Sequence, residues 1–196
     1  MATYVHNLAD FNLDKAVPVY IRQTEIMPVK LDDPAIKTMT DLKTIKVISI
    51  TPDRSMEFAE QLMKNAGVRM LLVVNPSSQL AGLVTARDIM GEKPVAIMTR
   101  DRIKREEIQV SQIMTPRAEL NPFNMLDVKH AKVRDVIHRL RDAGRQHAIV
   151  IEEQDDGKSY FVRGIFSITQ IGRQLGVEIS ADGHVQSFAE LERLIV

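Results

Sequence analysis

The chain has 196 residues, of which 44% are hydrophobic, and its 26 basic side chains balance its 26 acidic ones. A net charge of zero argues against a nucleic-acid-binding protein, because such proteins hold phosphates with an excess of cations. The absence of cysteine excludes disulfides, thiol nucleophiles and thiolate metal sites. The N-terminus is unlike a signal peptide, and no apolar run reaches the ~20 residues of a membrane span. We therefore expect a cytoplasmic, globular protein without membrane insertion.

Residues 1–34 are predicted to form an N-terminal extension. Residues 17–21 (VPVYI) have the composition of a short strand, and Pro18 favours an edge position because proline has no backbone donor. Residues 32–34 (DDP) are typical of a turn. The extension is expected either to pack back on the chain or to serve as a dimerisation arm.

Residues 35–93 are predicted to form the first of two domains. A helix over residues 56–66 carries one apolar stripe and is ended by Gly67. Residues 69–74 form an apolar strand without a polar face, which is typical of a central strand. The other expected elements are a strand at residues 47–50, a turn with a helix cap at 51–53, a turn at 75–78, a strand at 80–84 and a helix at 85–91.

Residues 94–109 are predicted to be a linker between the domains. Pro94 and a run of charges of both signs interrupt the regular pattern. No aromatic residue is interleaved with the cations, so we interpret the run as a solvated surface rather than as a nucleic-acid site.

Residues 110–177 are predicted to form the second domain, followed by a C-terminal tail at 178–196. The tail has apolar residues at helical spacing and is expected to dock on the body or on a second subunit. Each domain follows the order strand–helix–strand–strand–helix, which places the protein in the α+β (mixed α/β) class. The second domain's expected elements are a helix at 133–143 closed by Gly144, strands at 147–151 and 160–166 around a turn at 153–159, and a helix at 167–176.

The two domains are related as an internal repeat. Residues 82–88 (GLVTARD) correspond to residues 164–170 (GIFSITQ), and each domain has a Met-Thr pair near its start, Met39-Thr40 or Met114-Thr115. So short a unit cannot bury both faces of its sheet alone. The two copies are therefore predicted to pack on each other around a shared cleft.

Thr85 and Asp88 carry the clearest candidate chemistry. Their spacing puts a hydroxyl and a carboxylate on one side of the first turn of a helix. A carboxylate can accept from the two hydroxyls of a ribose, and a helix start with free N–H groups suits a phosphate. The same spacing also describes a capping box, which is the favoured interpretation on spacing alone.

No catalytic or metal-binding residue is predicted. No Ser or Thr is paired with a His and an orienting acid, as nucleophilic catalysis without cysteine would require. The five histidines lack the spacing of a metal site. We therefore do not expect an enzyme.

Taken together, the Met-Thr lead-in, the Ala-Gly helix stop, the aliphatic strand and the Gly-x-x-[Ser/Thr]-x-x-Asp motif resemble a pair of CBS domains over residues 35–176. In that family two copies form a pseudo-two-fold disc, the Bateman module. The resemblance implies two clefts that can bind AMP, ADP, ATP or another adenosyl compound.

The resemblance also assigns roles in the first cleft. Asp88 is expected to hold the ribose and Thr85 the phosphate, and Arg69 matches a position that often carries a basic phosphate ligand. The alternative for Arg69 is that its side chain simply extends from a strand end into water. The backbone of Leu83 is expected to contact the adenine, and Thr115 and Leu120 to form the opposing wall.

The second cleft departs from the pattern, because Gln170 replaces the carboxylate. An amide forms weaker hydrogen bonds than a charged group, so this cleft is the weaker candidate. His147 is the nearby cationic candidate, although a lone His at a strand start is more often structural. The residues expected here are Ser167, Gln170, Ile165, Thr40 and His147.

These observations predict a regulatory module that senses an adenine nucleotide and signals to an unidentified protein partner. The alternative is a ligand-independent interaction or scaffold protein with a vestigial cleft. We also expect a homodimer, since the family usually pairs modules through helices and two-fold interfaces are common. The residues expected at that contact are Met56, Leu62, Met63, Val136, Ile137 and Leu140.

Overall fold

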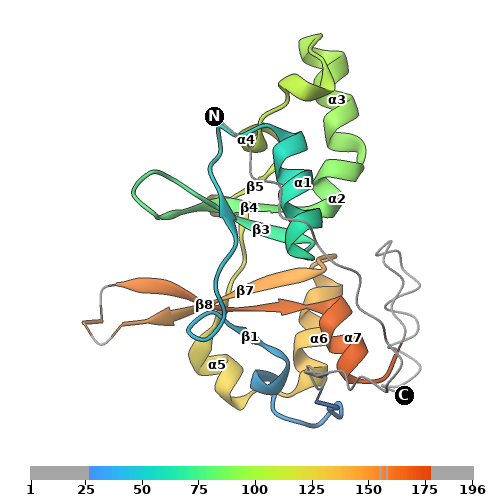
Figure 1. Ribbon diagram of the computed structural model, residues 1–196. Coiled ribbons are helices and arrows are strands. Elements are labelled where there is room, and N and C mark those ends of the chain that lie inside the picture. The colour runs from blue at the N-terminus through green and yellow to red at the C-terminus, as the bar shows by residue number, and fades with distance from the viewer. Residues whose placement is uncertain (1–26, 155, 158, 178–196) are drawn as a thin grey trace, which may run out of the picture.

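The computed structural model describes residues 27–154, 156, 157 and 159–177, which form two lobes stacked on each other (Figure 1). Each lobe is built on one four-stranded sheet, with strand order β2-β3-β4-β5 in the first and β1-β8-β7-β6 in the second. This is the mixed α/β arrangement that the sequence predicts.

The elements divide between the lobes as follows. The first lobe contains β2 (Ser49–Ile50), α1 (Met56–Ala66), β3 (Met70–Val74), β4 (Leu80–Thr85), α2 (Ala86–Met90), α3 (Glu92–Asp101), η2 (Arg105–Glu107), α4 (Val110–Ile113) and β5 (Thr115–Pro116). The short turn η3 (Arg117–Glu119) leads to the second lobe. That lobe contains β6 (Phe123–Asn124), α5 (Met125–His130), α6 (Val133–Asp142), β7 (His147–Glu153), β8 (Tyr160–Ser167) and α7 (Ile168–Gln174), with η1 (Ala35–Thr38) and β1 (Thr40–Asp41) from the start of the chain.

Alternating side chains on the central strands build both the cores and the contact between the lobes. On β3, Leu71 and Val73 pack with the helices of the first lobe, whereas Met70 and Leu72 face the second lobe. Ile149 on β7 completes this layer from the other side. Burial of both sheet faces explains the uniformly apolar strands and confirms that the two repeats pack on each other.

Each short edge strand comes just before one repeat in the sequence but pairs with the sheet of the other repeat. β1 precedes the first lobe but pairs antiparallel with β8 of the second, and β5 pairs with β4. A Cβ added at Gly82 would collide with the Thr115 carbonyl oxygen, and one at Gly164 with the Met39 side chain. The glycine that opens each repeated motif therefore makes room for the edge strand beside it.

The helix stops follow the prediction, whereas one helix start does not. Gly67 and Gly144 adopt left-handed φ angles of 64° and 60°, which glycine reaches without steric cost. The N-cap of α1 is Ser55, whose hydroxyl accepts from the Phe58 N–H, rather than a residue of 51–53. β3 is flanked by β2 and β4, which confirms its central position.

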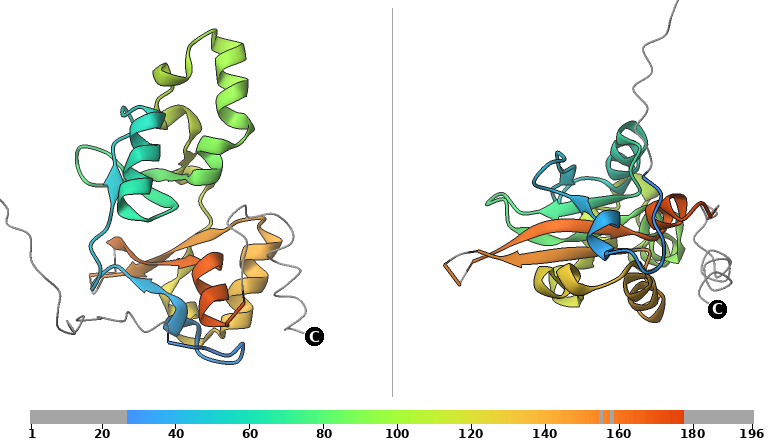
Figure 2. Two further views of the ribbon diagram at one scale, coloured as in Figure 1. Left: turned by 45° about the vertical axis from the view of Figure 1, so that its right-hand side comes forward. Right: turned by 90° about the horizontal axis from the view of Figure 1, so that it is seen from below.

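The prediction of an irregular linker at residues 94–109 is wrong for its first part, because α3 occupies residues 92–101. Pro94 lies in the first turn of this helix, where the missing N–H costs no hydrogen bond. Ile97 anchors the helix in the core of the first lobe. From there α3 runs away from the second lobe, as Figures 1 and 2 both show.

The described part of the N-terminal extension packs on the second lobe. Val29 is buried there, and its N–H donates to the Gln174 carbonyl at 3.0 Å. Ala35, which directly follows the extension, is likewise buried, and its N–H donates to the Ala131 carbonyl at 2.8 Å. The strand expected at residues 17–21 and the tail at 178–196 lie outside the described residues.

The residues expected at a dimer contact are instead core residues. Met56, Met63, Val136, Ile137 and Leu140 are each at most 4% exposed within one chain, and Leu62 is partly buried. The prediction of this contact is wrong because each helical stripe covers the sheet of its own lobe.

Candidate functional site

A cavity of about 860 Å³ opens where the two lobes meet. The first lobe supplies one wall and the start of β7 the other, so a ligand here would contact both repeats. The residues that line it are Arg69, Leu83, Thr85, Arg87, Asp88, Met90, Gly91, Glu92, Lys93, Thr115, Glu119, Gly144, Arg145, Gln146 and His147.

Thr85 and Asp88 form a capping box at the start of α2, and both line the cavity. The Thr85 N–H and hydroxyl donate to Asp88 Oδ2 at 2.9 and 2.6 Å. In return, the Asp88 N–H donates to the Thr85 hydroxyl at 3.3 Å. The Asp88 side chain is 12% exposed. Capping therefore fixes the carboxylate at the cavity wall without removing it from the cavity.

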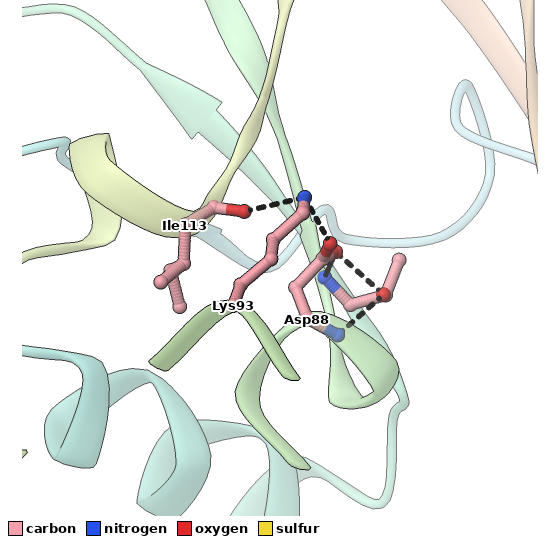
Figure 3. A network of polar contacts seen from close by, with 4 residues as sticks. Asp88, Lys93 and Ile113 are labelled. Carbon is pink, nitrogen blue, oxygen red and sulfur yellow. Dashed lines mark hydrogen bonds and ion pairs between the residues drawn. The ribbon is translucent and has the colours of Figure 1, made fainter. Parts of the chain in front are cut away.

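Lys93 occupies the other oxygen of this carboxylate. Its ammonium lies 2.6 Å from Asp88 Oδ1 and also donates to the Ile113 carbonyl at 2.9 Å (Figure 3). The Lys93 side chain remains 49% exposed, so the pair lies at the boundary between cavity and solvent.

Arg69 and Arg87 add positive charge to the first-lobe wall. Neither side chain makes a hydrogen bond or an ion pair with another residue in the described part of the chain. Arginine binds phosphate through a planar fork of N–H donors. These two guanidinium groups are therefore available to an anionic ligand.

The second lobe contributes Arg145 and His147. The Arg145 guanidinium donates to the Glu119 carbonyl at 2.8 Å. Burial, and then the charge of Arg69, lower the pKa of His147 from 6.5 to about 4, although Asp88 acts in the opposite direction. His147 was expected at the second cleft. It does pair with Ser167 across β7 and β8, but it lines the Asp88 cavity.

Thr115 and Leu120 do not form the wall that was expected of them. Thr115 lines the cavity but lies beside Leu83 as its partner in the same sheet. Leu120 packs in the apolar layer between the lobes and is not part of the cavity lining. The facing wall comes instead from residues 144–147, because β5 crosses to the first sheet.

The residues predicted to form the second cleft are arranged around Gln170. The Thr40 hydroxyl donates to Gln170 Oε1 at 3.0 Å, and Thr40 pairs with Ile165 in the sheet. Ser167 begins α7 without a side-chain cap. The structure thus brings these four residues together, with the amide oxygen engaged by a residue of the chain itself.

Three cations of the Asp88 cavity were not among the residues predicted from the sequence. Arg87 lies within the repeated motif itself and could have been noticed there. Lys93 lies just beyond the motif, at the start of the helix that was taken for a linker. Arg145 directly follows Gly144, and only the packing of the lobes brings it to the cavity.

Part of the chain matches a known protein family, and the fold resembles solved structures. Residues 38–94 match the family model of the CBS domain. The chain therefore contains a CBS domain over these residues. Its two-lobed fold is similar to the CBS-domain protein TA0289 of Thermoplasma acidophilum, of unknown function, with a TM-score of 0.51 and 17% identity over 80% of this chain and 76% of that one. CBSX2 of Arabidopsis thaliana, crystallised in complex with AMP, matches with a TM-score of 0.49 and 20% identity over 69% of this chain and 90% of its own.

A relative of known activity matches over a shorter stretch. Homoserine O-acetyltransferase of Methanosalsum zhilinae is 31% identical over 75 residues. These residues are 38% of the CBS-domain chain but only 15% of the enzyme. The match does not extend over enough of the enzyme to assign its activity to this chain.

The described residues include neither a metal site nor a membrane-spanning helix. No group of three or more His, Asp or Glu side chains in that part of the chain is placed to hold a metal ion. No helix within the same residues is both long and apolar enough to cross a membrane.

Proposed function

We propose that this CBS-domain protein is a regulatory module that binds an adenine nucleotide, or another adenosyl compound, in the cavity at Asp88 and signals to a partner. One observation carries the proposal: a carboxylate and a hydroxyl at a helix start share a cavity with four cationic side chains drawn from both lobes. A ribose is matched by the carboxylate and a phosphate by the cations.

In the proposed complex, Asp88 accepts from the ribose hydroxyls while Thr85 and Arg69 bind the phosphate. Leu83 lines the cavity, and its backbone is proposed to contact the adenine. No residue in this arrangement is assigned a catalytic step, so the role proposed for the protein is binding alone.

Signalling follows from the position of the cavity between the lobes. A ligand that touches both walls favours the lobe arrangement in which both contacts are made. It shifts that equilibrium only by the difference between its affinities for the two arrangements. The partner would read this difference in arrangement.

The proposal gives one dominant site per chain. The contact between Thr40 and Gln170 uses an acceptor that a ribose would need in the second cleft, and the Gln170 amide carries no charge. Ser167, Gln170 and Ile165 are therefore proposed to form at most a weak second site.

Equilibrium dialysis against adenosine, AMP, ADP, ATP and GMP tests the proposal. We expect the adenosine compounds to bind and AMP to bind more tightly than GMP. Failure of every adenosine compound to bind would contradict the proposal. That result would favour the alternative, a ligand-independent scaffold.

A further inference from the structure

The carboxylate proposed to bind ribose has both of its oxygens engaged by the chain. Asp88 Oδ2 accepts from the backbone and the hydroxyl of Thr85, as the capping of α2 requires. Asp88 Oδ1 accepts from Lys93 at 2.6 Å. A vicinal diol that donates to Oδ1 competes there with the Lys93 ammonium, which already lies within hydrogen-bond distance of that oxygen.

Lys93 also connects elements on two sides of the site. It is the second residue of α3, and it donates to the carbonyl of Ile113, the last residue of α4 (Figure 3). β5 follows immediately and supplies Thr115 to the cavity. One ammonium thus links the site to the start of α3 and to the segment that leads into β5.

Because Lys93 lies in the first turn of α3, its ion pair with Asp88 affects the stability of that helix. A cation in the first turn is unfavourable, because the N-terminus of a helix carries partial positive charge. The Asp88 carboxylate offsets this repulsion while the two side chains are paired. When the pair opens, the first turn of α3 loses that compensation, whereas Ile97 still holds the rest of the helix.

We propose that Lys93 is a latch that exchanges with the ribose of the ligand, so that binding releases the first turn of α3. The latch rests on the proposed function, because it requires Asp88 to be the ribose acceptor. The Lys93–Asp88 pair lowers the affinity for the ligand. Because ligand binding opens this pair, the stability of the first turn of α3 depends on whether the site is occupied.

Calorimetric titration with adenosine tests the exchange, since this ligand is neutral and has no phosphate for a lysine to bind. Lys93→Met should bind adenosine about 2- to 5-fold more tightly than the unmodified protein, as expected for the loss of a competing, half-exposed ion pair. Lys64→Met is the matched control. Lys64 forms a similar exposed ion pair with Glu60, 2.7 Å long, and neither residue lines the Asp88 cavity. The control should leave the affinity unchanged.

Salt provides a second measurement with the same probe. Raising the ionic strength weakens an exposed ion pair, so adenosine should bind the unmodified protein more tightly at high salt, whereas Lys93→Met should show no such gain. By hydrogen exchange, adenosine should speed the amides of residues 95–97 in the unmodified protein, because these are the N–H groups that close the first turn of α3. In Lys93→Met these amides should already be fast.

The outcomes separate the latch from the proposed function. If adenosine binds, Asp88→Ala weakens it, and Lys93→Met leaves it unchanged or weaker, the latch is wrong while the site stands. If the unmodified protein and Lys93→Met bind neither adenosine nor AMP, the proposed function fails and the latch fails with it.

Discussion

At the scale of residues, Asp88 has two roles in one position. Its backbone and one carboxylate oxygen complete the capping box with Thr85, and the rest of the carboxylate borders the cavity. Capping and ligand binding are compatible here because a carboxylate has room for several donors. Substitution of Asp88 is therefore expected to affect both helix stability and binding.

Arg69 is predicted to set the preference for phosphate. The unmodified protein should bind AMP more tightly than adenosine, because the free guanidinium can pair with the phosphate. Arg69→Met should reduce this difference and leave adenosine affinity nearly unchanged. Competition binding of adenosine against AMP, on the unmodified protein and on Arg69→Met, measures the difference between the two affinities. An unchanged preference in Arg69→Met would show that Arg69 extends into solvent and is not the phosphate ligand.

His147 is predicted to make stability depend on pH. Its pKa is about 4 in the folded chain and near 6.5 when unfolded, so the unfolded chain takes up the proton first as the pH falls. Its contribution to stability is full above about pH 7 and is lost as the pH falls from 6.5 to 4. The expected loss is on the order of 1 to 3 kcal/mol, since the side chain is only partly buried.

Urea unfolding between pH 7.5 and 4.5 measures this loss. His147→Gln should flatten the pH dependence, whereas the control His138→Gln should retain it. Equal pH dependence in the unmodified protein and His147→Gln would mean that this imidazole is not the group that titrates.

At the scale of elements, the two glycines at the edge strands have different tolerances. A Cβ at Gly82 meets the Thr115 backbone, whereas one at Gly164 meets the flexible end of Met39. Gly82→Ala should lower the free energy of unfolding by about 1 to 3 kcal/mol and weaken nucleotide binding, because β5 must move. Gly164→Ala should cost less. Thermal unfolding compares them, and a larger loss for Gly164→Ala would contradict the proposed role of β5.

Local signals predict some elements well and others poorly. Gly67 and Gly144 end their helices because glycine alone reaches that φ easily, and apolar strands such as residues 70–74 are visible in the sequence. The two-residue strands β1 and β5 are not visible, because their pairing depends on strands far along the chain. Pro94 was misinterpreted because a proline that interrupts a helix can also begin one.

Some residues of the candidate site could likewise be predicted from local sequence signals, whereas others could not. Thr85 and Asp88 could be predicted because they lie within one motif. The facing wall could not, since the packing of the lobes, and not the sequence spacing, brings Arg145 and His147 opposite them. Leu120 was assigned to the cavity from family resemblance, but it packs in the apolar layer between the lobes.

At the scale of the whole molecule, each buried helical stripe stabilises the core of its own lobe. Ile137 is 2% exposed in the core of the second lobe, so Ile137→Ala should lower the free energy of unfolding by about 2 to 5 kcal/mol. Leu126→Ala, at a position 61% exposed, is the control and should have little effect. Urea unfolding measures both. If Ile137→Ala were as stable as the unmodified protein but monomeric, Ile137 would instead be assigned to a dimer contact.

The homodimer itself stays a prediction, now without its expected contact residues. Light scattering at micromolar concentration should give about twice the chain mass of 22.1 kDa. A mass equal to one chain would contradict it.

The central claim is that one nucleotide binds per chain, between the lobes and on Asp88. Calorimetric titration with AMP measures the stoichiometry directly, on the unmodified protein and on the paired variants Asp88→Ala and Gln170→Ala. We expect one AMP per chain, an affinity loss of about 1.5 to 3 kcal/mol in Asp88→Ala, as for a charge-assisted hydrogen bond, and little change in Gln170→Ala. Two equal sites per chain, or equal losses in the two variants, would contradict the account.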